Sequence, residues 1–295
     1  MSVDGLVVAV VGGDEREREI ARLAARAGAR VRAYGFSWPK SGIPDVALAA
    51  EAAAAMGGAR YALFPVPGLA PDGSLFAPAA PAPIVPDERL LGVLAPRAHL
   101  ILGAADERLR ATAARLEIGV HEYEADRELM LLRGPAIVEG AIGVAIEHTD
   151  VTIHSAEVAV VGHGTIGSLL VQGLLALGAR VHVAARNPAQ RAAAYASGAR
   201  PLPLEELPAL APRLAMLFST VPARVVGADV LEQLPAGSLV LDLAAPPGGV
   251  ELDTARALGH RAVWARGLGR RAPVTVGASQ WLGIRRRIEA IEARR

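Results

Sequence analysis

Residues 157–187 constrain the fold more than any other part of the chain, because they combine four elements in one order. An apolar strand runs into Gly162-His163-Gly164-Thr165-Ile166-Gly167, an amphipathic helix follows, and the stretch ends in a second strand, Val181-His182-Val183-Ala184. This order is typical of the unit that binds a dinucleotide. Gly162 makes the tight turn, Gly164 lets the backbone approach the pyrophosphate, and Gly167 lets the helix pack on the strand. The sequence therefore predicts a Rossmann domain.

The same unit predicts which dinucleotide is bound. The backbone N–H groups at Thr165 and Ile166 start the helix and are expected to face the phosphates. After the second strand come Ala185, Arg186 and Asn187, where an NAD-selective site usually carries an acid for the ribose 2′-hydroxyl. Arg186 instead offers a planar cation that suits a 2′-phosphate, although it is also compatible with a merely solvated arginine. We predict NADP as the cofactor.

The composition excludes several classes of protein. The 31 basic and 30 acidic residues nearly cancel, so the chain offers no field for nucleic acid or an acidic membrane. The absence of cysteine excludes disulfides and thiolate catalysis, and the seven histidines lack the spacing of metal ligands, so we predict no metal. We find no signal peptide and no apolar run of membrane-spanning length, and we expect a soluble, cytoplasmic protein.

Strands alternate with helices along most of the chain. Strands are predicted at 6–11, 31–34, 61–64, 99–102, 120–121, 157–161, 181–184, 214–218, 238–243 and 261–265, and helices at 15–27, 45–56, 87–94, 106–117, 188–196 and 251–258. This alternation predicts two doubly wound parallel sheets, that is, an α/β fold. The first sheet is expected to be flavodoxin-like rather than a second dinucleotide fold, because Gly12-Gly13-Asp14 lacks the third glycine.

The domain boundaries follow from two helices. Residues 1–134 form a predicted substrate or partner domain, 135–150 an interdomain helix, and 151–273 the Rossmann domain. Pro135 suits the first turn of the interdomain helix, which is rich in small residues. The last helix, in residues 274–295, carries Trp281, Ile284, Ile288 and Ile291 on one face. That apolar face needs a partner, so we expect this helix to pack back onto the first domain.

Ligands in open α/β sheets bind outside the carboxyl ends of the strands. In the second domain this rule places the cofactor beside Ser219, Thr220, Val221, Pro222 and Ala244. In the first domain it places a substrate beside Gly13, Asp14, Pro67 and Gly68. Both sets are expected to border one shared cleft.

The motifs, taken in chain order, resemble the family of dipicolinate synthase A subunits. The resemblance covers nearly the whole chain and is carried by Val11-Gly12-Gly13-Asp14 with Arg16, Phe64-Pro65-Val66-Pro67-Gly68, Val138-Glu139-Gly140, Ile146-Glu147-His148-Thr149-Asp150, Thr152-Ile153-His154, Gly162 to Gly167, Ala185-Arg186, Leu241-Asp242-Leu243-Ala244 and Pro247-Gly248-Gly249. The departures are His163 and Thr165, where the family tends to carry Leu and Arg, and the arginine-rich Gly269-Arg270-Arg271.

The resemblance implies an NADP-dependent oxidoreductase that acts on a CH–CH donor. Its substrate would be a dihydrodipicolinate, made from the hydroxy-tetrahydrodipicolinate of lysine biosynthesis, and its product dipicolinate, pyridine-2,6-dicarboxylate. The resemblance also implies a partner, the flavoprotein-like B subunit of the synthase, and expression in the mother cell during sporulation. A homo-oligomer is a further option that the sequence leaves open.

A substrate with two carboxylates needs cationic or N–H donors. Arg16, Arg270 and the helix start near Thr275 are the candidates, together with the backbone at Gly12-Gly13. Arg16 could instead pair with a neighbouring acid such as Glu15 or Glu19.

Glu139 and His148 are the candidate general bases. Each also has a structural alternative: Glu139 as a carboxylate favoured by a helix dipole, and His148 as a histidine satisfied by hydrogen bonds.

Two other functions compete with this hypothesis. The first is another two-domain dehydrogenase, of a 2-hydroxy acid or an amino acid, which usually carries a histidine–acid pair or a catalytic lysine. Lys40 is the only lysine in the chain, which disfavours lysine-based chemistry. The second is a non-enzymatic role as an NADP-binding scaffold for a flavoprotein subunit.

Overall fold

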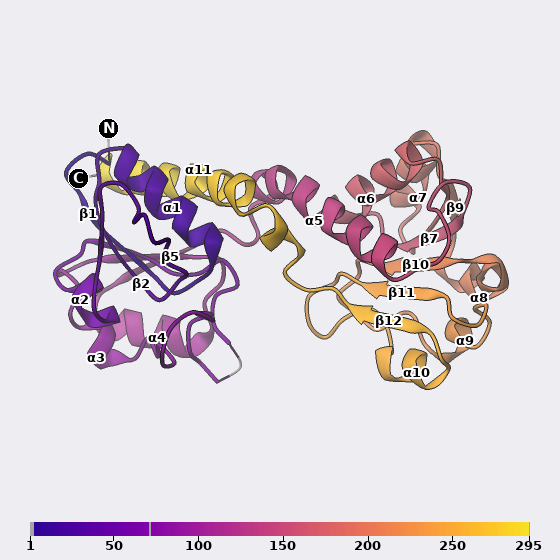
Figure 1. Cartoon of the computed structure of the whole chain (residues 1–295), viewed down its shortest axis with the longest axis horizontal. Helices are drawn as coiled ribbons and strands as arrows, with labels where there is room; N and C mark the ends of the chain where they lie inside the picture. Colours follow the sequence, from indigo (N-terminus) through magenta and orange to yellow (C-terminus); the bar gives the residue numbers. More distant parts are fainter. Residues whose placement is uncertain (1–2, 71, 295) are drawn as a thin grey trace. The chain divides into compact units, whose positions relative to one another are not determined.

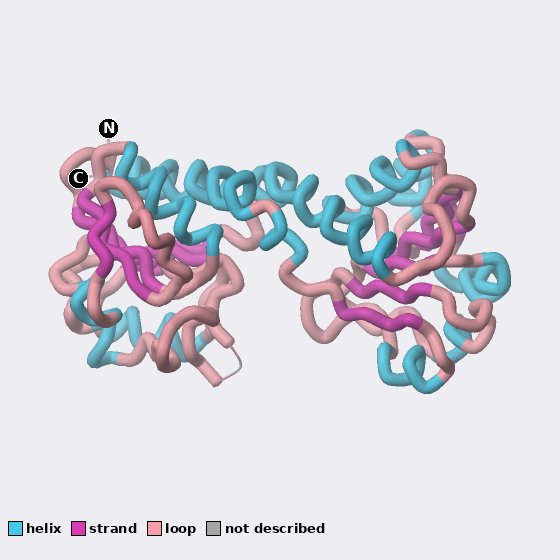
Figure 2. The backbone as a smooth tube through the Cα atoms, viewed as in Figure 1, coloured by secondary structure: helices cyan, strands magenta, loops and turns pink. Residues whose placement is uncertain are grey.

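The structure, a computed structural model, describes residues 3–70 and 72–294 and divides the chain into two compact units. The first unit contains the chain up to Arg133 and again from Ala272 onward, and the second contains Gly134–Arg271. In each unit the strands gather into one sheet with helices around it (Figure 2). These two parallel sheets of six strands confirm the predicted doubly wound α/β class.

The first unit is built on the sheet β3-β2-β1-β4-β5-β6 (Figure 1). Its elements are β1 (Val7–Val11), α1 (Glu15–Arg26), β2 (Arg30–Tyr34), β3 (Val46–Leu48), α2 (Ala52–Met56), β4 (Tyr61–Leu63), α3 (Glu88–Leu91), β5 (His99–Leu102), α4 (Glu107–Arg115), β6 (Gly119–Glu122) and, from the end of the chain, α11 (Pro273–Glu292). A long helix, α5 (Arg127–Glu147), begins in this unit and ends in the second.

The second unit is built on the sheet β12-β11-β10-β7-β8-β9. Its elements are β7 (Glu157–Val161), α6 (Thr165–Ala176), β8 (Arg180–Ala184), α7 (Pro188–Ala196), β9 (Arg200–Leu202), η1 (Leu204–Glu206), α8 (Leu207–Leu210), η2 (Ala211–Arg213), β10 (Met216–Ser219), α9 (Ala228–Leu231), β11 (Leu239–Asp242), α10 (Leu252–Ala257), β12 (Arg261–Trp264) and η3 (Leu268–Arg271).

The two sheets have the same strand order. Numbered within its own unit, each sheet runs 3-2-1-4-5-6, which is the order of dinucleotide-binding folds. The flavodoxin-like order, 2-1-3-4-5, which we expected for the first sheet, is therefore not the one observed.

The difference arises at residues 45–56, where we predicted one alanine-rich helix. In the structure β3 pairs with β2, with Val46 opposite Val31 and Leu48 opposite Ala33, and the helix α2 begins only at Ala52. Pairing with an existing strand outweighs the helical propensity of the alanines.

The central strand of each sheet explains why the sheet lies inside its unit. Val8 and Val10 of β1 point into one apolar cluster, while Ala9 and Val11 point into the cluster on the other face. The second unit repeats this arrangement around β7. Strands buried on both faces read as continuous apolar runs, as expected for parallel sheets that are covered by helices.

Helix α5 differs from its prediction in two respects. It begins at Arg127, so that Pro135 lies inside the helix rather than in its first turn, and Glu139 is likewise internal. It is also long and apolar enough to cross a membrane by length and composition, contrary to our expectation that no segment would be. Ala141 and Ala145 of this helix are fully buried in the core of the second unit. The core helix of a soluble protein passes the same test.

Helix α11 returns to the first unit, as predicted, and packs along α1 (Figure 1). The contact is close: a Cβ at Gly277 would lie 2.7 Å from the Arg16 carbonyl oxygen. Trp281, Ile284 and Ile288 are 7, 1 and 0 % exposed within the core of this unit. The last helix therefore completes a core that begins with β1.

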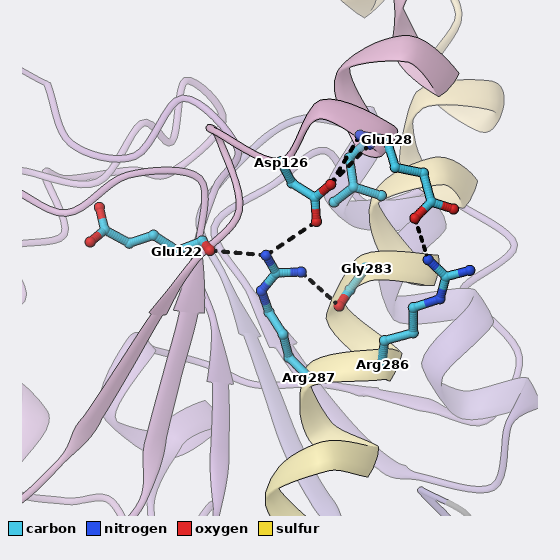
Figure 3. Close-up of polar contacts among 7 residues, drawn as sticks. Glu122, Asp126, Glu128, Gly283, Arg286 and Arg287 are labelled. Carbon is cyan, nitrogen blue, oxygen red and sulfur yellow. Dashed lines mark hydrogen bonds and ion pairs between the residues drawn. The ribbon is translucent and has the colours of Figure 1, made fainter.

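Two arginines of α11 fasten it to the turn between β6 and α5 (Figure 3). Arg287 donates to the Glu122 carbonyl oxygen at 3.1 Å and lies 3.4 Å from the Asp126 carboxylate, while Arg286 pairs with Glu128 at 2.5 Å. Arg287 also donates to the Gly283 carbonyl oxygen of its own helix. The apolar face of α11 covers the core, and its arginines fix one side of the helix.

The substitution Ile288→Ala tests how much the first unit depends on α11. Truncating a fully buried isoleucine costs about 2–5 kcal/mol of unfolding free energy, measured by urea denaturation. Val274, on the same helix but 61 % exposed, supplies the control, because Val274→Ala should change that free energy by less than about 0.5 kcal/mol. Equal effects of the two substitutions would contradict the packing described.

Candidate functional site

A cavity of about 770 Å³ opens at the carboxyl ends of β7, β8 and β10. It gathers many of the residues predicted to contact a cofactor, namely Gly162, Gly164, Ala185, Arg186, Asn187, Thr220, Val221 and Pro222. Its remaining lining residues are Val161, His163, Ala184, Pro188, Gln190, Leu204 and Val225. The lining contains no acid, and its one arginine is Arg186.

The three glycines of the loop after β7 differ in what surrounds them. A Cβ at Gly162 would lie 2.6 Å from Val221 Cγ2, and the φ of +91° at this residue also favours glycine. A Cβ at Gly167 would lie 2.4 Å from the Gly162 carbonyl oxygen. A Cβ at Gly164 would meet nothing within 4 Å. Gly162 and Gly167 thus serve the packing of the loop, while Gly164 borders open space.

The N-terminus of α6 is bare. Its N-cap residue is Gly164, no side chain accepts a hydrogen bond from the first turn, and that turn contains no acid. Thr165 and Ile166 are half-buried at this position. The first N–H groups of a helix lack partners inside the helix and favour an anion. The bare N-terminus and the open space at Gly164 together fit a pyrophosphate, so these residues could hold a dinucleotide.

The end of β8 is organised by a residue that our sequence analysis missed. Arg191 Nη1 donates hydrogen bonds of 2.8 Å to the carbonyl oxygens of both Ala185 and Arg186. Asn187 Oδ1 accepts from the Ala189 N–H and caps α7. An arginine in the second turn of a helix is visible in the sequence, but its reach back to the strand end is not.

Other predicted cofactor residues lie behind the cavity rather than on it. Ser219 is fully buried, and its Oγ has no hydrogen-bond partner within the described residues. Ala244, 5 % exposed, is held by Asp242, which also accepts from the Gly249 N–H at 2.7 Å. Asp242 fixes the loop after β11 and was not predicted as a site residue.

His163 lines the cavity, although the sequence marks it only as a departure from the family pattern. Its side chain is 8 % exposed, and Nδ1 has no partner in the described part of the chain. Burial lowers the pKa of this imidazole below its usual value. The neutral ring is therefore the favoured form at the cavity wall.

The N-terminus of α1 contrasts with that of α6. Asp14 accepts from the Arg16 N–H at 3.1 Å, and Glu17 accepts from the Asp14 N–H at 2.8 Å, so that the two side chains form a capping box. The Gly13 N–H donates to the Phe76 carbonyl oxygen. A Cβ at Gly13 would lie 2.2 Å from the Glu17 carboxylate. The N–H groups at which we expected a substrate anion are already satisfied by the protein.

Arg16 is buried and already paired. Its Nε and Nη2 bind the two Asp14 oxygens at 2.8 and 2.9 Å, and the residue is 5 % exposed. The alternative to substrate binding therefore has a different partner from those we named, because Glu19 pairs with Arg22 instead. Breaking a buried pair by removing one member costs about 3–5 kcal/mol, so this arginine is also part of the fold.

The other predicted substrate residues are spread over both units. In the first unit Pro67 is exposed, Gly68 is buried against Ala104, and Thr275 is exposed in the first turn of α11. Arg270 is exposed in η3 of the second unit.

The two candidate bases occupy different positions in the second unit. Glu139 of α5 forms an ion pair with Arg271 of η3, and both side chains are about half exposed. His148 lies beyond the end of α5, and its carbonyl oxygen accepts from Arg261, the first residue of β12. Strands of a parallel sheet start at the edge opposite their carboxyl ends, so His148 lies away from the cavity. This position disfavours His148 as a base for chemistry there.

Comparisons with known proteins agree with this architecture. The family described as the N-terminal domain of the dipicolinate synthase A subunit matches residues 7–124. The dipicolinate synthase A subunit of Bacillus subtilis (strain 168) is 29 % identical over 274 residues, which is 92 % of each chain. The crystal structure of the corresponding protein from Bacillus halodurans superposes with a TM-score of 0.87 at 27 % identity, over 96 % of this chain and 98 % of that one. The chain belongs to the family of dipicolinate synthase A subunits.

The fold extends beyond this family. A transhydrogenase from Sinorhizobium meliloti superposes with a TM-score of 0.69 at 15 % identity, over 92 % of this chain and 88 % of that one. An L-alanine dehydrogenase gives 0.59 at 17 %, over 92 and 86 %. At these identities the likeness shows the shared fold.

Among the residues that the structure describes, no group of three or more His, Cys, Asp or Glu side chains could hold a metal ion. We predicted no metal from the spacing of the histidines. His182 binds Glu157 at 2.6 Å and His99 contacts His121 at 3.1 Å, so these histidines have protein partners.

Glu17 should make the stability of the protein depend on pH. Burial raises the pKa of Glu17 to about 7, although Arg16 opposes the shift. A raised carboxyl pKa favours the protonated native state, so the stabilisation is complete below about pH 4.5 and is lost as the pH rises through 7. Glu17→Gln stays neutral and should remove up to about 3 kcal/mol of that decline between pH 5 and 8.

The measurement is urea unfolding of the wild type and Glu17→Gln across this pH range. Glu15→Gln, in the same turn of α1, is the control for removing an acid from this helix. Parallel curves for the wild type and Glu17→Gln would show that Glu17 is ionised in the native state.

Proposed function

We propose that the chain oxidises a dihydrodipicolinate to dipicolinate with NADP as the hydride acceptor, as the A subunit of a dipicolinate synthase. The observation that carries this proposal is the cavity at the ends of β7, β8 and β10, in a chain of the dipicolinate synthase family. The fold is one that dehydrogenases share, which supports an oxidoreductase.

The dinucleotide site is proposed at the bare N-terminus of α6. Its pyrophosphate would take the N–H groups at Thr165 and Ile166, with Gly162, Gly164 and Gly167 giving the backbone its approach. When bound, the nicotinamide supplies the acceptor for a hydride from the ring. Thr220, Val221, Pro222 and the residues behind them, Ser219 and Ala244, would limit the position of the cofactor within the cavity.

The preference for NADP rests on the end of β8. Arg186 is exposed, and within residues 3–70 and 72–294 its guanidinium has no hydrogen bond or ion pair. Because no acid lines the cavity, nothing there repels a 2′-phosphate. Ala185 and Asn187 flank the arginine and complete the proposed ribose site.

The proposed substrate carries two carboxylates, and the protein offers two kinds of donor. Arg270 and the first turn of α11 at Thr275 are exposed and need no rearrangement to bind an anion. Arg16 would need a substrate carboxylate to replace Asp14 at its guanidinium, which Gly13, Pro67 and Gly68 leave to local movement of the loops after β1 and β4.

Glu139 is the proposed general base for the second proton. Its Arg271 partner stabilises the ionised carboxylate, the form that accepts a proton. Aromatisation supplies much of the driving force, so positioning the ring is the main task of the protein.

The setting of the reaction is proposed from the family. The relative from Bacillus subtilis is named as one lettered component of its synthase, which implies that it works with a second component. We propose that this chain works with a flavoprotein-like B subunit, in the cytoplasm of the mother cell during sporulation.

The proposed reaction is tested by NADPH formation from freshly generated dihydrodipicolinate, with and without the flavoprotein-like partner. Gly164→Ala is the matched control, because its Cβ meets nothing within 4 Å yet would occupy the proposed path of the pyrophosphate. We expect Gly164→Ala to keep the melting temperature of the wild type and to lose both NADP binding and activity. No NADPH from the wild type under either condition would overturn the proposal, and activity only with the partner would assign the chemistry to the complex.

Cofactor choice is tested by Arg186→Asp. The wild type should bind NADP more tightly than NAD, and the substitution should reverse this order by about 1.5–3 kcal/mol, as expected for one charge-assisted contact. The measurement is the Kd of each nucleotide by isothermal titration calorimetry. Equal Kd values in the wild type would contradict the choice of NADP.

A further inference from the structure

Two arginines meet at the end of β8 without a carboxylate partner. The guanidinium of Arg186 is free among the described residues, and Arg191 uses only Nη1, which binds two backbone carbonyl oxygens. Neither arginine forms an ion pair within the described ranges, whereas Arg180 and Arg213 of the same unit both pair with Glu157. Two uncompensated cations beside one cavity favour an anionic ligand.

Arg191 also fixes the backbone that carries Arg186. Its two hydrogen bonds reach back five and six positions along the chain, from α7 to the peptide units that follow β8. The second of these units belongs to Arg186 itself. Asn187 caps α7 immediately after it, so both sides of Arg186 are tied down while its side chain stays exposed.

We propose that Arg191 is a positioning residue for the ribose 2′-phosphate, which it selects by fixing the Arg186 backbone and by adding a second positive charge. This inference rests on the proposed NADP site and deepens it. A phosphate dianion at Arg186 gains from both effects, whereas a free 2′-hydroxyl gains from neither. Preorganisation of this kind raises affinity by lowering the ordering cost of binding.

The test measures the Kd of four probes: NADP, NAD, 2′,5′-ADP and 5′-AMP. The last two lack the nicotinamide and report the adenosine end alone. For Arg191→Ala we expect the affinity for NADP and for 2′,5′-ADP to fall about tenfold to a hundredfold, the value of one charge-assisted hydrogen bond. The affinities for NAD and 5′-AMP should stay within about twofold of the wild type.

Two further variants separate charge from geometry and from folding. Arg191→Lys keeps the charge but not the planar two-carbonyl contact, so its loss for 2′,5′-ADP should be smaller than that of Arg191→Ala. Arg213→Ala, which removes an arginine paired with Glu157 at the start of β7, is the control and should leave all four affinities unchanged. If Arg191→Ala does not fold, Arg191→Lys carries the test through its ratio of 2′,5′-ADP to 5′-AMP affinity.

The outcomes distinguish this inference from the proposed function. An equal loss for all four probes would make Arg191 a structural residue and overturn the inference, as would no loss for any probe. If Arg186→Asp abolishes the NADP preference while Arg191→Ala and Arg191→Lys do not, NADP stands and the role of Arg191 fails. A wild type that binds 5′-AMP as tightly as 2′,5′-ADP would refute the NADP site itself.

Discussion

The function of each unit depends on what occupies the N-terminus of the helix after its first strand. Both units have the 3-2-1-4-5-6 strand order, so topology alone makes each of them a dinucleotide-binding half. In the first unit the carboxylates of Asp14 and Glu17 take the free N–H groups of α1. In the second unit Gly164 leaves the N–H groups of α6 unpaired beside open space. A few side chains thus close one site and open the other within the same fold.

The closed N-terminus has its own cost. Asp14, Arg16 and Glu17 are all buried, and buried charges persist only where each has partners. The bidentate pair between Arg16 and Asp14 supplies partners for two of them, while burial shifts Glu17 toward its neutral form. This cluster links the loops after β1 and β4, because Glu17 also accepts from the Val66 N–H. It therefore belongs to the scaffold of the first unit, whatever the substrate contacts there.

Much of the fold could be predicted from the sequence, because its signals are local. The glycine motif and the apolar face of α11 each combine a periodic pattern with a fixed spacing. The strand β3 could not be predicted, because its pairing with β2 is a tertiary contact that alanine propensity hides. The pairing of Arg16 and the edge of the sheet occupied by His148 also depend on three-dimensional proximity. In the cofactor site the glycines could be predicted, but the backbone contacts of Arg191 could not.

The path of the chain determines which unit can finish folding first on the ribosome. Residues 134–271 contain the whole second unit, so its core is available as soon as η3 has left the exit tunnel. The first unit is synthesised earlier but lacks Trp281, Ile284 and Ile288 until the end of translation. Domains usually fold in the order of synthesis. Here the N-terminal unit must wait, with the surface of α1 that α11 will cover exposed to solvent or to a chaperone in the meantime.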